Sequence, residues 1–456
     1  MDRVDHFGRD LFVALDRADA RPLRSQLEEQ LREGVRSGRL HSGTALPSTR
    51  ALAAELGVAR GVVVEAYEQL VAEGFLVARR GSATRVARVA PPTPRAATAA
   101  SRIPPARFDL RAESADRAAF PRRAWLAAAR RAMAAAPDAD LGYGTWAGAP
   151  RLRAALVAYV GRSRGVVAEP DQVVVTAGIT QAVALLATVL RRRGARALIV
   201  EDPGFDHHRV LLERSGIAVA PVAVDDRGLR TDGLPAAAAA LVTPAHQMPT
   251  GAVLAPERRA ALLDWAAAGD ALILEDDYDG EYRYDREPVG ALQGLGPARV
   301  VYMGSTSKTL APALRLGWMV LPGDLSQALA EERGWADGGS PVLDQLALAQ
   351  FIERGELDRH LRRMRLYYRR RRDALIAALA RELPELAVTG AAAGLHVTLV
   401  LPGGVDAEAV AERALARGVA LRGCAPGLLF VGYANIADAA IEPAIAALAE
   451  ALRAAH

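Results

Sequence analysis

From about residue 107 onward, short runs of apolar residues alternate with longer stretches of helical periodicity. The runs read QVVVTA, RALIVE, AALVT, ALILE, RVVYMG and GWMVL. Apolar runs this short are typical of strands buried on both faces, and the helical stretches between them supply the crossovers that parallel strands require. The pattern therefore predicts an α/β domain on a largely parallel sheet. Ligands of such sheets bind outside the carboxyl ends of the strands, so polar residues directly after these runs are candidate site residues.

The 456 residues are enough for two or three domains, each with its own core. Residues 21–88 form a first predicted domain, and residues 89–106, rich in proline and alanine, form a linker. The large α/β domain is predicted to span residues 107–340. Residues 341–456 begin with a helical section and continue with the apolar runs HVTLVL and LLFVGYA, which predict a smaller α+β domain.

The first domain is predicted to be a winged helix-turn-helix. Leucine or valine recurs every fourth residue from Leu23 to Val35, which predicts a helix. The stretches GTALPSTRALAAELG and ARGVVVEAYEQLVAEG predict two further helices joined by a short turn. The runs FLVA and TRVA on either side of RRGS predict a two-stranded wing. A small helical cap on a larger protein is the alternative.

Basic residues are concentrated in this first domain. Residues 21–88 contain 11 arginines, seven glutamates and no aspartate, which accounts for the whole chain's charge of +4. Arg60 lies near the N-terminus of the third helix, the part of a helix-turn-helix that meets base edges. Phosphate contacts are predicted for Arg50, Arg79, Arg80 and Arg85. The expected partner is therefore double-stranded operator DNA.

Composition excludes several other classes of protein. No apolar run approaches the roughly 20 residues of a membrane helix, and the first residues lack the apolar region of a secretory signal. Cys424 is the only cysteine, which excludes a disulfide framework within the chain and a thiolate metal cluster. We expect a cytoplasmic protein without a metal site.

The chain contains a single lysine, Lys308, among 57 lysine and arginine residues. Arginine supplies positive charge but not an amine nucleophile, and a Schiff base requires a primary amine. Ser305, Ser307 and Arg315 surround Lys308, and two hydroxyls with a guanidinium can bind phosphate. The alternative is chance, since a single lysine has to lie somewhere. Its position beside a predicted anion pocket favours a functional lysine.

Two further strand ends carry polar groups or exposed backbone. Gly178 follows a strand and precedes a helix, where backbone N–H groups bind anions; the alternative is a simple tight turn. Asp276, Asp277 and Tyr278 follow another strand. A carboxylate there can hold a heterocyclic nitrogen protonated, although a solvated acidic loop or a Mg²⁺ site are alternatives. A reactive lysine, such a carboxylate and a phosphate cradle together predict pyridoxal 5′-phosphate (PLP).

Motifs along nearly the whole chain point to one family. GTALPSTRALAAELGVARGVVVEAYEQLVAEGFL is similar to the head of GntR regulators. LGYGTWAGAPRLRAAL, TAGITQA, EDPGF, TPAHQMPTG, EDDYDGEYRY, GSTSKTLAPALRLGW and RHLRRMRLYYRRRRDAL are similar to a regulatory aminotransferase-like domain. The chain thus resembles the MocR group of GntR-type transcription regulators. The fold class implied is a winged helix-turn-helix fused to a fold-type I aminotransferase domain, with a large mixed-sheet part and a small C-terminal α+β part.

The resemblance implies a role for each matching residue. Lys308 would form a Schiff base with PLP, Asp276 would pair with the pyridine nitrogen, and Tyr278 would contact the ring hydroxyl. The groups implied for the phosphate are Ser305, Ser307, Arg315 and the backbone around Gly178 and Ile179.

The remaining implied contacts involve an aromatic ring and a second subunit. Phe205, in EDPGF, would stack on the cofactor ring. Because the family assembles as a head-to-tail homodimer, Tyr143, in LGYG, would reach the partner's site.

The chain departs from aminotransferases at two positions. Met248, beside Gln247, stands where those enzymes have asparagine in HNPTG. Phe430 stands about where they have the arginine that binds the substrate carboxylate, and Arg422 is the nearest substitute. We therefore expect a PLP-dependent transcription regulator that senses PLP, an amine or an amino acid, with at most partial transamination. The alternatives are a working aminotransferase with a DNA-binding module and a DNA-binding protein that has lost its cofactor.

Overall fold

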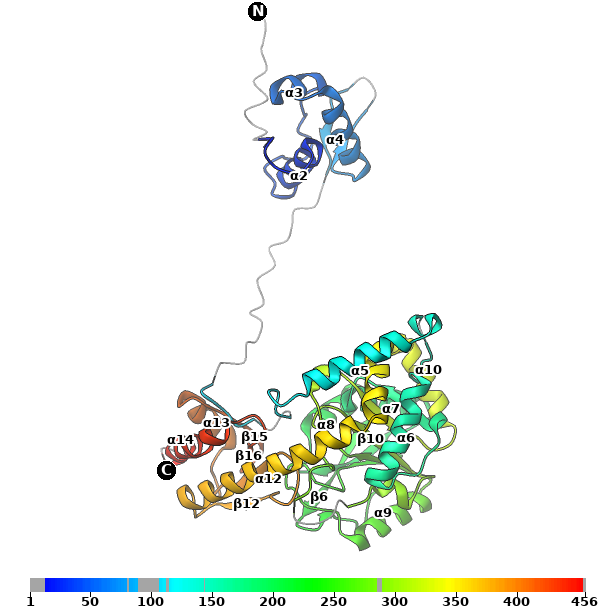
Figure 1. Ribbon diagram of the computed structural model, residues 1–456, viewed down its shortest axis with the longest axis vertical. Helices are drawn as coiled ribbons and strands as arrows, with labels where there is room; N and C mark the ends of the chain where they lie inside the picture. Colours follow the sequence, from blue (N-terminus) through cyan, green and yellow to red (C-terminus); the bar gives the residue numbers. More distant parts are fainter. Residues whose placement is uncertain are drawn as a thin grey trace, which may run out of the picture. The chain divides into compact units, whose positions relative to one another are not determined.

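The computed structural model describes residues 13–79, 82–88, 106–111, 115–142, 144–284 and 289–453. The chain divides into two compact units, Met1–Pro104 and Pro105–His456, which Figure 1 draws with the first unit in blue. Arg80 and Tyr143, two of the predicted site residues, lie outside the described residues.

The first unit is a winged helix-turn-helix, as predicted. Its helices are α2 (Leu23–Arg36), α3 (Thr49–Leu56) and α4 (Arg60–Ala72), and its antiparallel strands are β1 (Leu76–Val77) and β2 (Arg85–Val86). Helix α3 is capped at its start by Ser48, whose Oγ accepts a hydrogen bond from the Ala51 N–H, and at its end by Gly57 in the left-handed conformation (φ 62°). Buried leucines and valines from all three helices, such as Leu27, Leu52 and Val63, form its core.

An eight-stranded sheet is the framework of the second unit. Its strands are β4 (Val173–Thr176), β5 (Ala197–Asp202), β6 (Ala218–Asp225), β7 (Gly228–Leu229), β8 (Ala239–Val242), β9 (Leu272–Asp276), β10 (Val300–Ser305) and β11 (Gly317–Val320). The order is β4-β11-β10-β9-β8-β5-β6-β7, and β10, β9, β8, β5 and β6 pair in parallel. Strand β11 runs antiparallel to β4 and β10. The predicted largely parallel sheet is confirmed, with the mixed character that the family implied.

Helices cover both faces of this sheet. They are α6 (Pro150–Arg164), α7 (Ile179–Arg192), α8 (Asp206–Arg214), α9 (Pro256–Ala268) and α10 (Leu325–Asp337). Two further helices, α5 (Arg122–Ala135) and α11 (Val342–Glu353), pack against each other, and α11 packs against α6. Neighbouring residues of β9 show the division: Leu274 packs with apolar residues of α7 and α10, whereas Ile273 packs with those of α9. The strands are buried on both faces because crossover helices lie on each side.

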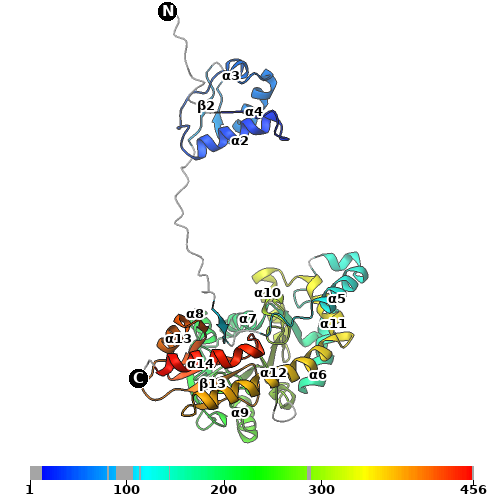
Figure 2. The same cartoon turned by 60° about the vertical axis from the view of Figure 1, so that its left-hand side comes forward.

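A second, antiparallel sheet belongs to the C-terminal part. Its order is β12 (Ala387–Thr389), β13 (His396–Val400), β16 (Leu428–Gly432) and β15 (Arg422–Ala425). Helices α13 (Ala407–Ala416) and α14 (Ile441–Arg453) pack beside it (Figure 2). Strand β3 (Phe108–Asp109) pairs in parallel with β14 (Val419–Ala420), so the start of the predicted large domain adds a strand to the small one.

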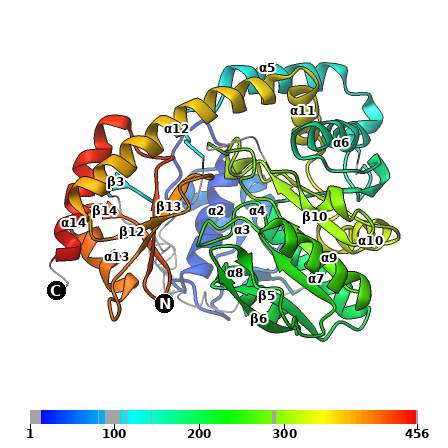
Figure 3. The ribbon, with the colours of Figure 1, turned by 90° about the horizontal axis from the view of Figure 1, so that it is seen from below.

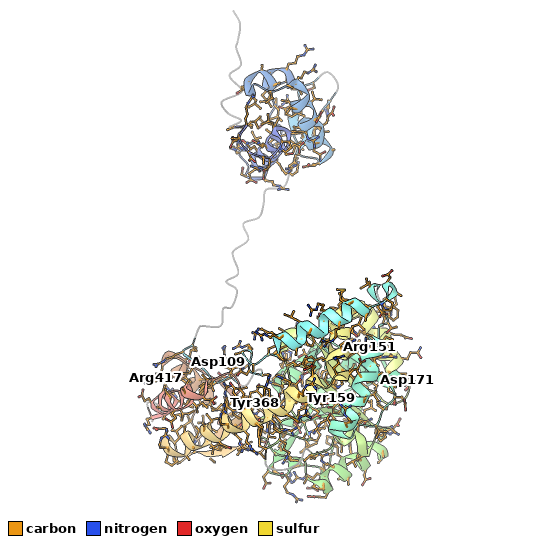
Figure 4. The ribbon with its side chains drawn as sticks, in the orientation of Figure 1. Asp109, Arg151, Tyr159, Asp171, Tyr368 and Arg417 are labelled. Atoms are coloured by element: carbon orange, nitrogen blue, oxygen red, sulfur yellow. The ribbon has the colours of Figure 1, made fainter. Side chains whose placement is uncertain are left out.

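Helix α12 (Glu356–Glu382) runs along both parts of the second unit (Figure 3). Tyr159 of α6 and Tyr368 of α12, labelled in Figure 4, are buried in the same core. None of the helices in the described ranges is long and apolar enough to span a membrane.

Candidate functional site

Several predicted site residues lie at one edge of the large sheet because their strands end there. Asp276 is the last residue of β9 and Ser305 the last of β10, and the two strands are parallel neighbours. Lys308 is half-buried in the turn that follows β10. Within this turn, the Ser307 N–H donates to Ser305 Oγ at 3.3 Å. The structure therefore brings Lys308, Asp276 and both serines to the carboxyl edge of the sheet.

Arg315 returns to this edge because β11 runs antiparallel to its neighbours. Gly317, the first residue of β11, lies opposite Ser305 of β10 and Thr176 of β4. Arg315, two residues earlier, has a left-handed backbone (φ 50°), which is costly for a residue with a Cβ. Such strain is maintained where the surrounding structure fixes a functional position.

Gly178 and Arg315 lie side by side at the start of α7. Gly178 has φ 106°, and a Cβ added to it would lie 3.7 Å from Arg315 Nη1. Ile179 is the first residue of the 14-residue helix α7, whose initial N–H groups carry partial positive charge. The Arg315 guanidinium thus lies beside a helix N-terminus, an arrangement suited to phosphate.

Asp276 has a buried carboxyl group, one oxygen of which accepts no hydrogen bond from the described residues. Its Oδ1 makes no hydrogen bond within the described part of the chain, and its Oδ2 lies 3.8 Å from His208 Nδ1. Burial, followed by the charges of Asp277, Asp279 and Glu201, raises the pKa of Asp276 well above its usual value, and Lys308 opposes this. A cationic hydrogen-bond donor at Oδ1 would relieve the cost of ionising this carboxyl.

Tyr278 belongs to a buried chain of polar groups. Its hydroxyl lies 3.0 Å from His246 Nδ1, which also lies 2.9 Å from Asp279 Oδ2. Since the Asp279 carboxylate can only accept, His246 Nδ1 carries the hydrogen and donates it to Asp279. Tyr278 Oη is a second acceptor of the same N–H. Burial, followed by Asp279, raises the pKa of Tyr278 well above 10, so its own O–H remains available to donate.

Phe205 lies at the rim of a small pocket over Asp276. It immediately precedes α8, its side chain is 43% exposed, and its ring packs edge-on against His208 with centroids 4.8 Å apart. The pocket lining includes Glu201, Phe205, His208, Thr243, Met248 and Asp276. Burial raises the pKa of Glu201 to about 7, although its carboxylate accepts hydrogen bonds from Thr243. An exposed ring beside a buried carboxyl can cover a flat heterocycle.

Comparisons with known proteins agree with this geometry. Residues 23–86 match bacterial regulatory proteins of the gntR family, and residues 113–448 match the aminotransferase class I and II family. The HTH-type pyridoxine biosynthesis transcriptional regulator PdxR of Corynebacterium glutamicum is 37% identical over 399 residues, 86% of each chain. The probable rhizopine catabolism regulatory protein MocR of Rhizobium meliloti is 34% identical over 431 residues, 89% of this chain and 87% of that one.

This chain belongs to the MocR group of GntR-type transcription regulators. It is an HTH-type regulator with an aminotransferase-like domain, as predicted. Among solved structures, the kynurenine aminotransferase of Pyrococcus horikoshii matches with a TM-score of 0.69 and 25% identity, covering 76% of this chain and 91% of that one. The second unit of this MocR protein therefore has the fold of PLP-dependent aminotransferases.

The MocR site residues fit PLP on observations of this structure. The unpartnered Asp276 Oδ1 provides an acceptor for a protonated ring nitrogen. Gly178 leaves room beside Arg315 where any other residue would place a Cβ. These features, with the half-buried Lys308 at the same edge of the sheet, match a ring, a phosphate and an aldehyde in one ligand.

The MocR head exposes four of the five arginines that were predicted to contact DNA. Arg60 is the first residue of α4, and its Nε lies 3.4 Å from Thr49 Oγ1. Arg50 of α3 and Arg79 after β1 are both exposed. Arg85 is also exposed, but its Nη1 donates to the Gly43 carbonyl at 2.8 Å and so also holds the wing against the loop before α3.

The two departures from aminotransferases occupy defined places in the MocR domain. Met248 lines the pocket over Asp276. Phe430, in β16, is buried and packs edge-on against His396 with ring centroids 4.6 Å apart. Arg422 of β15 lies directly across from Phe430.

Sequence reasoning missed the buried groups behind the predicted MocR site. Glu201 is the second-last residue of β5, so a search for polar residues at strand ends could have identified it. His208, His246 and Asp279 became visible only through their contacts, because nothing in the sequence distinguishes a buried histidine that supports a site from one that fills a core.

Proposed function

We propose that this MocR protein is a PLP-dependent transcription regulator in which Lys308 holds PLP through a Schiff base. PLP supplies an aldehyde carbon that bonds to primary amines. The signal is then PLP itself, or an amine or amino acid that reacts with it. The observation that carries this proposal is the meeting of Lys308, the Asp276 carboxyl with its unpartnered Oδ1, and the Gly178–Arg315 pair at one sheet edge.

The chain's own residues would orient the cofactor. The Asp276 carboxylate would accept a hydrogen bond from the ring nitrogen and keep it protonated. The Tyr278 O–H, set by His246 and Asp279, would donate to the ring oxygen. Ser305, Ser307, Arg315 and the N–H groups at Gly178 and Ile179 would hold the phosphate, and Phe205 would cover the ring. The relative named for pyridoxine biosynthesis supports a signal of this chemical class.

The exposed apolar surface of the second unit supports a homodimer, which we propose to be head-to-tail. Trp335 is 81% exposed, Leu126 67% and Leu141 58%, and Trp146 packs near Trp335 with ring centroids 6.4 Å apart. Large apolar side chains grouped on a surface mark protein interfaces. A dimer carries two helix-turn-helix heads, which suits an operator with two half-sites.

Operator binding tests the proposed regulator through Arg60. Replacing Arg60 with alanine should weaken binding to an operator selected from random duplexes by about 1–3 kcal/mol, and it should reduce sequence preference. Fluorescence anisotropy at several salt concentrations measures both effects. Arg24→Ala is the matched control, because Arg24 is exposed on α2 and pairs with Glu28 and Glu65.

Both variants should retain the absorbance of bound PLP. Unchanged affinity, preference and salt dependence in Arg60→Ala would show that the recognition helix is placed wrongly.

A further inference from the structure

A groove lies between the large and small parts of the second unit, beside the proposed cofactor site. Phe205 and Met248 line its large-domain side, and both also line the pocket that contains Asp276. Phe430 and Arg422 are among the residues that line its small-domain side. What this groove recognises depends on the cofactor at Lys308 and so rests on the proposed function.

The strand register of the small sheet places one row of side chains across the groove wall. Thr398 of β13 lies opposite Phe430 of β16, and Phe430 lies opposite Arg422 of β15. Residues directly opposite in antiparallel strands share a face. Thr398 is fully buried and its Oγ1 donates to the Pro249 carbonyl at 2.7 Å, whereas Arg422 is exposed. The row therefore begins at the buried contact of Thr398 with the large domain and passes through Phe430. It ends at the Arg422 cation, whose strand lies about 5 Å from the strand of Phe430.

Phe430, in the middle of this row, belongs to a stack of rings near Lys308. Its ring packs against His396, which in turn packs against His246 with ring centroids 5.4 Å apart. The positive charge of Lys308 contributes to lowering the pKa of His396, so Lys308 lies close to this stack. A ligand that reaches Lys308 through the groove consequently passes between Phe430 on one side and Phe205 and Met248 on the other.

The charges around the groove disfavour an anion at this inner end. Burial, followed by His246 and Lys308, lowers the pKa of His396 well below 6.5, so its ring is neutral at pH 7. The acidic side chains of Asp206 and Glu408 also line the groove. Among the described residues, Arg422 is the only arginine or lysine in the groove lining. In the pocket over Asp276, Arg209 is paired with Asp202 at 3.2 Å.

We infer that the groove selects a primary amine that bears no carboxylate on the carbon next to its nitrogen. The substituents of that carbon would contact Phe430, Phe205 and Met248. A carboxylate in the same place would lose its water against these apolar side chains, which weakens its binding. The groove thus favours an amine over the α-amino acid that differs from it only by the added carboxylate.

Matched ligand pairs test this inference directly. Isothermal titration calorimetry of the PLP-loaded protein would compare pentylamine with norleucine, and 2-phenylethylamine with phenylalanine. Each amine should bind at least tenfold more tightly than its amino acid. Phe430→Arg should reverse the preference by supplying a cation, whereas Phe430→Leu, which keeps the wall apolar, should retain it. The wild-type comparison stands by itself if Phe430→Arg fails to fold.

Three outcomes would overturn the inference. The inference would be overturned if norleucine bound at least as tightly as pentylamine. Loss of norleucine binding in Arg422→Gln would then identify Arg422 as the residue that binds the carboxylate. Failure of both ligand classes to bind would leave PLP itself as the signal. In each of these cases PLP remains attached to Lys308, so the proposed function survives; absence of PLP from Lys308 would instead overturn both.

Discussion

Replacing Asp276 with asparagine should have opposite effects on cofactor binding and on the stability of the cofactor-free protein. Asparagine keeps the shape of the side chain and one acceptor oxygen, but it carries no charge for a protonated ring nitrogen. A hydrogen bond to a charged group contributes about 1.5–3 kcal/mol, and about 1.4 kcal/mol corresponds to a factor of ten. The dissociation constant for PLP should therefore rise about 10- to 150-fold.

The cofactor-free variant should be more stable than the wild type at alkaline pH. The pKa of Asp276 in the folded chain is raised, chiefly by burial, well above the ordinary value of 3.8. A raised carboxyl pKa means that the folded state favours the neutral acid. The resulting loss of folding stability is absent below pH 3.8 and grows as the pH rises above that value. Asparagine has no such cost. Asp276→Asn without PLP should melt above the wild type at pH 8, and this difference should shrink toward pH 4.

Fluorescence titration with PLP and thermal melting at the two pH values measure these effects. Glu275→Gln is the matched control for PLP affinity, because Glu275 precedes Asp276 in β9 and its buried carboxylate accepts the N–H groups of Leu292 and Gln293. Its PLP affinity should equal that of the wild type. An unchanged PLP affinity in Asp276→Asn, or a lower melting temperature at pH 8, would refute the assigned role of the Asp276 carboxyl.

Two further substitutions separate the phosphate site from the buried acid beneath the pocket. Arg315→Ala should weaken PLP binding about 10- to 100-fold but leave pyridoxal, which lacks the phosphate, unaffected in the same titration; equal losses for both ligands would contradict the phosphate role. Glu201→Gln should stabilise the protein at pH 8 by up to about 3 kcal/mol and not at pH 4.5, because burial raises the Glu201 pKa from 4.5 to about 7. Urea denaturation measures the latter, and a pH-independent difference would contradict it.

Local apolar patterns predicted much of the sheet because its central strands are buried on both faces. The runs at β4, β5, β8, β9, β10 and β11 are continuous and therefore visible in the sequence. Strand β6 was missed because Pro221 interrupts it and it is partly exposed along its length. Strand β6 lies near the edge of the sheet, where only the two-residue β7 follows it. A proline and partly exposed residues are compatible with such an edge position.

The predicted site residues follow from strand ends, but their supporting contacts do not. Arg315 approaches Gly178 only because β11 is antiparallel, and a single run of apolar residues does not give strand direction. The His246–Asp279 contact joins residues 33 positions apart, and the His396–Phe430 contact joins two strands of the small sheet. Such contacts depend on tertiary packing, which periodicity does not encode.

The covalent attachment of PLP to Lys308 is the central claim, and reductive trapping tests it most directly. The purified protein, incubated with PLP and then reduced with borohydride, should yield one modified peptide by mass spectrometry, with the cofactor on Lys308. Lys308→Arg should keep the same fold by circular dichroism and yield no modified peptide. Modification at another amine, such as the N-terminus, or no modification of the wild type would contradict the account.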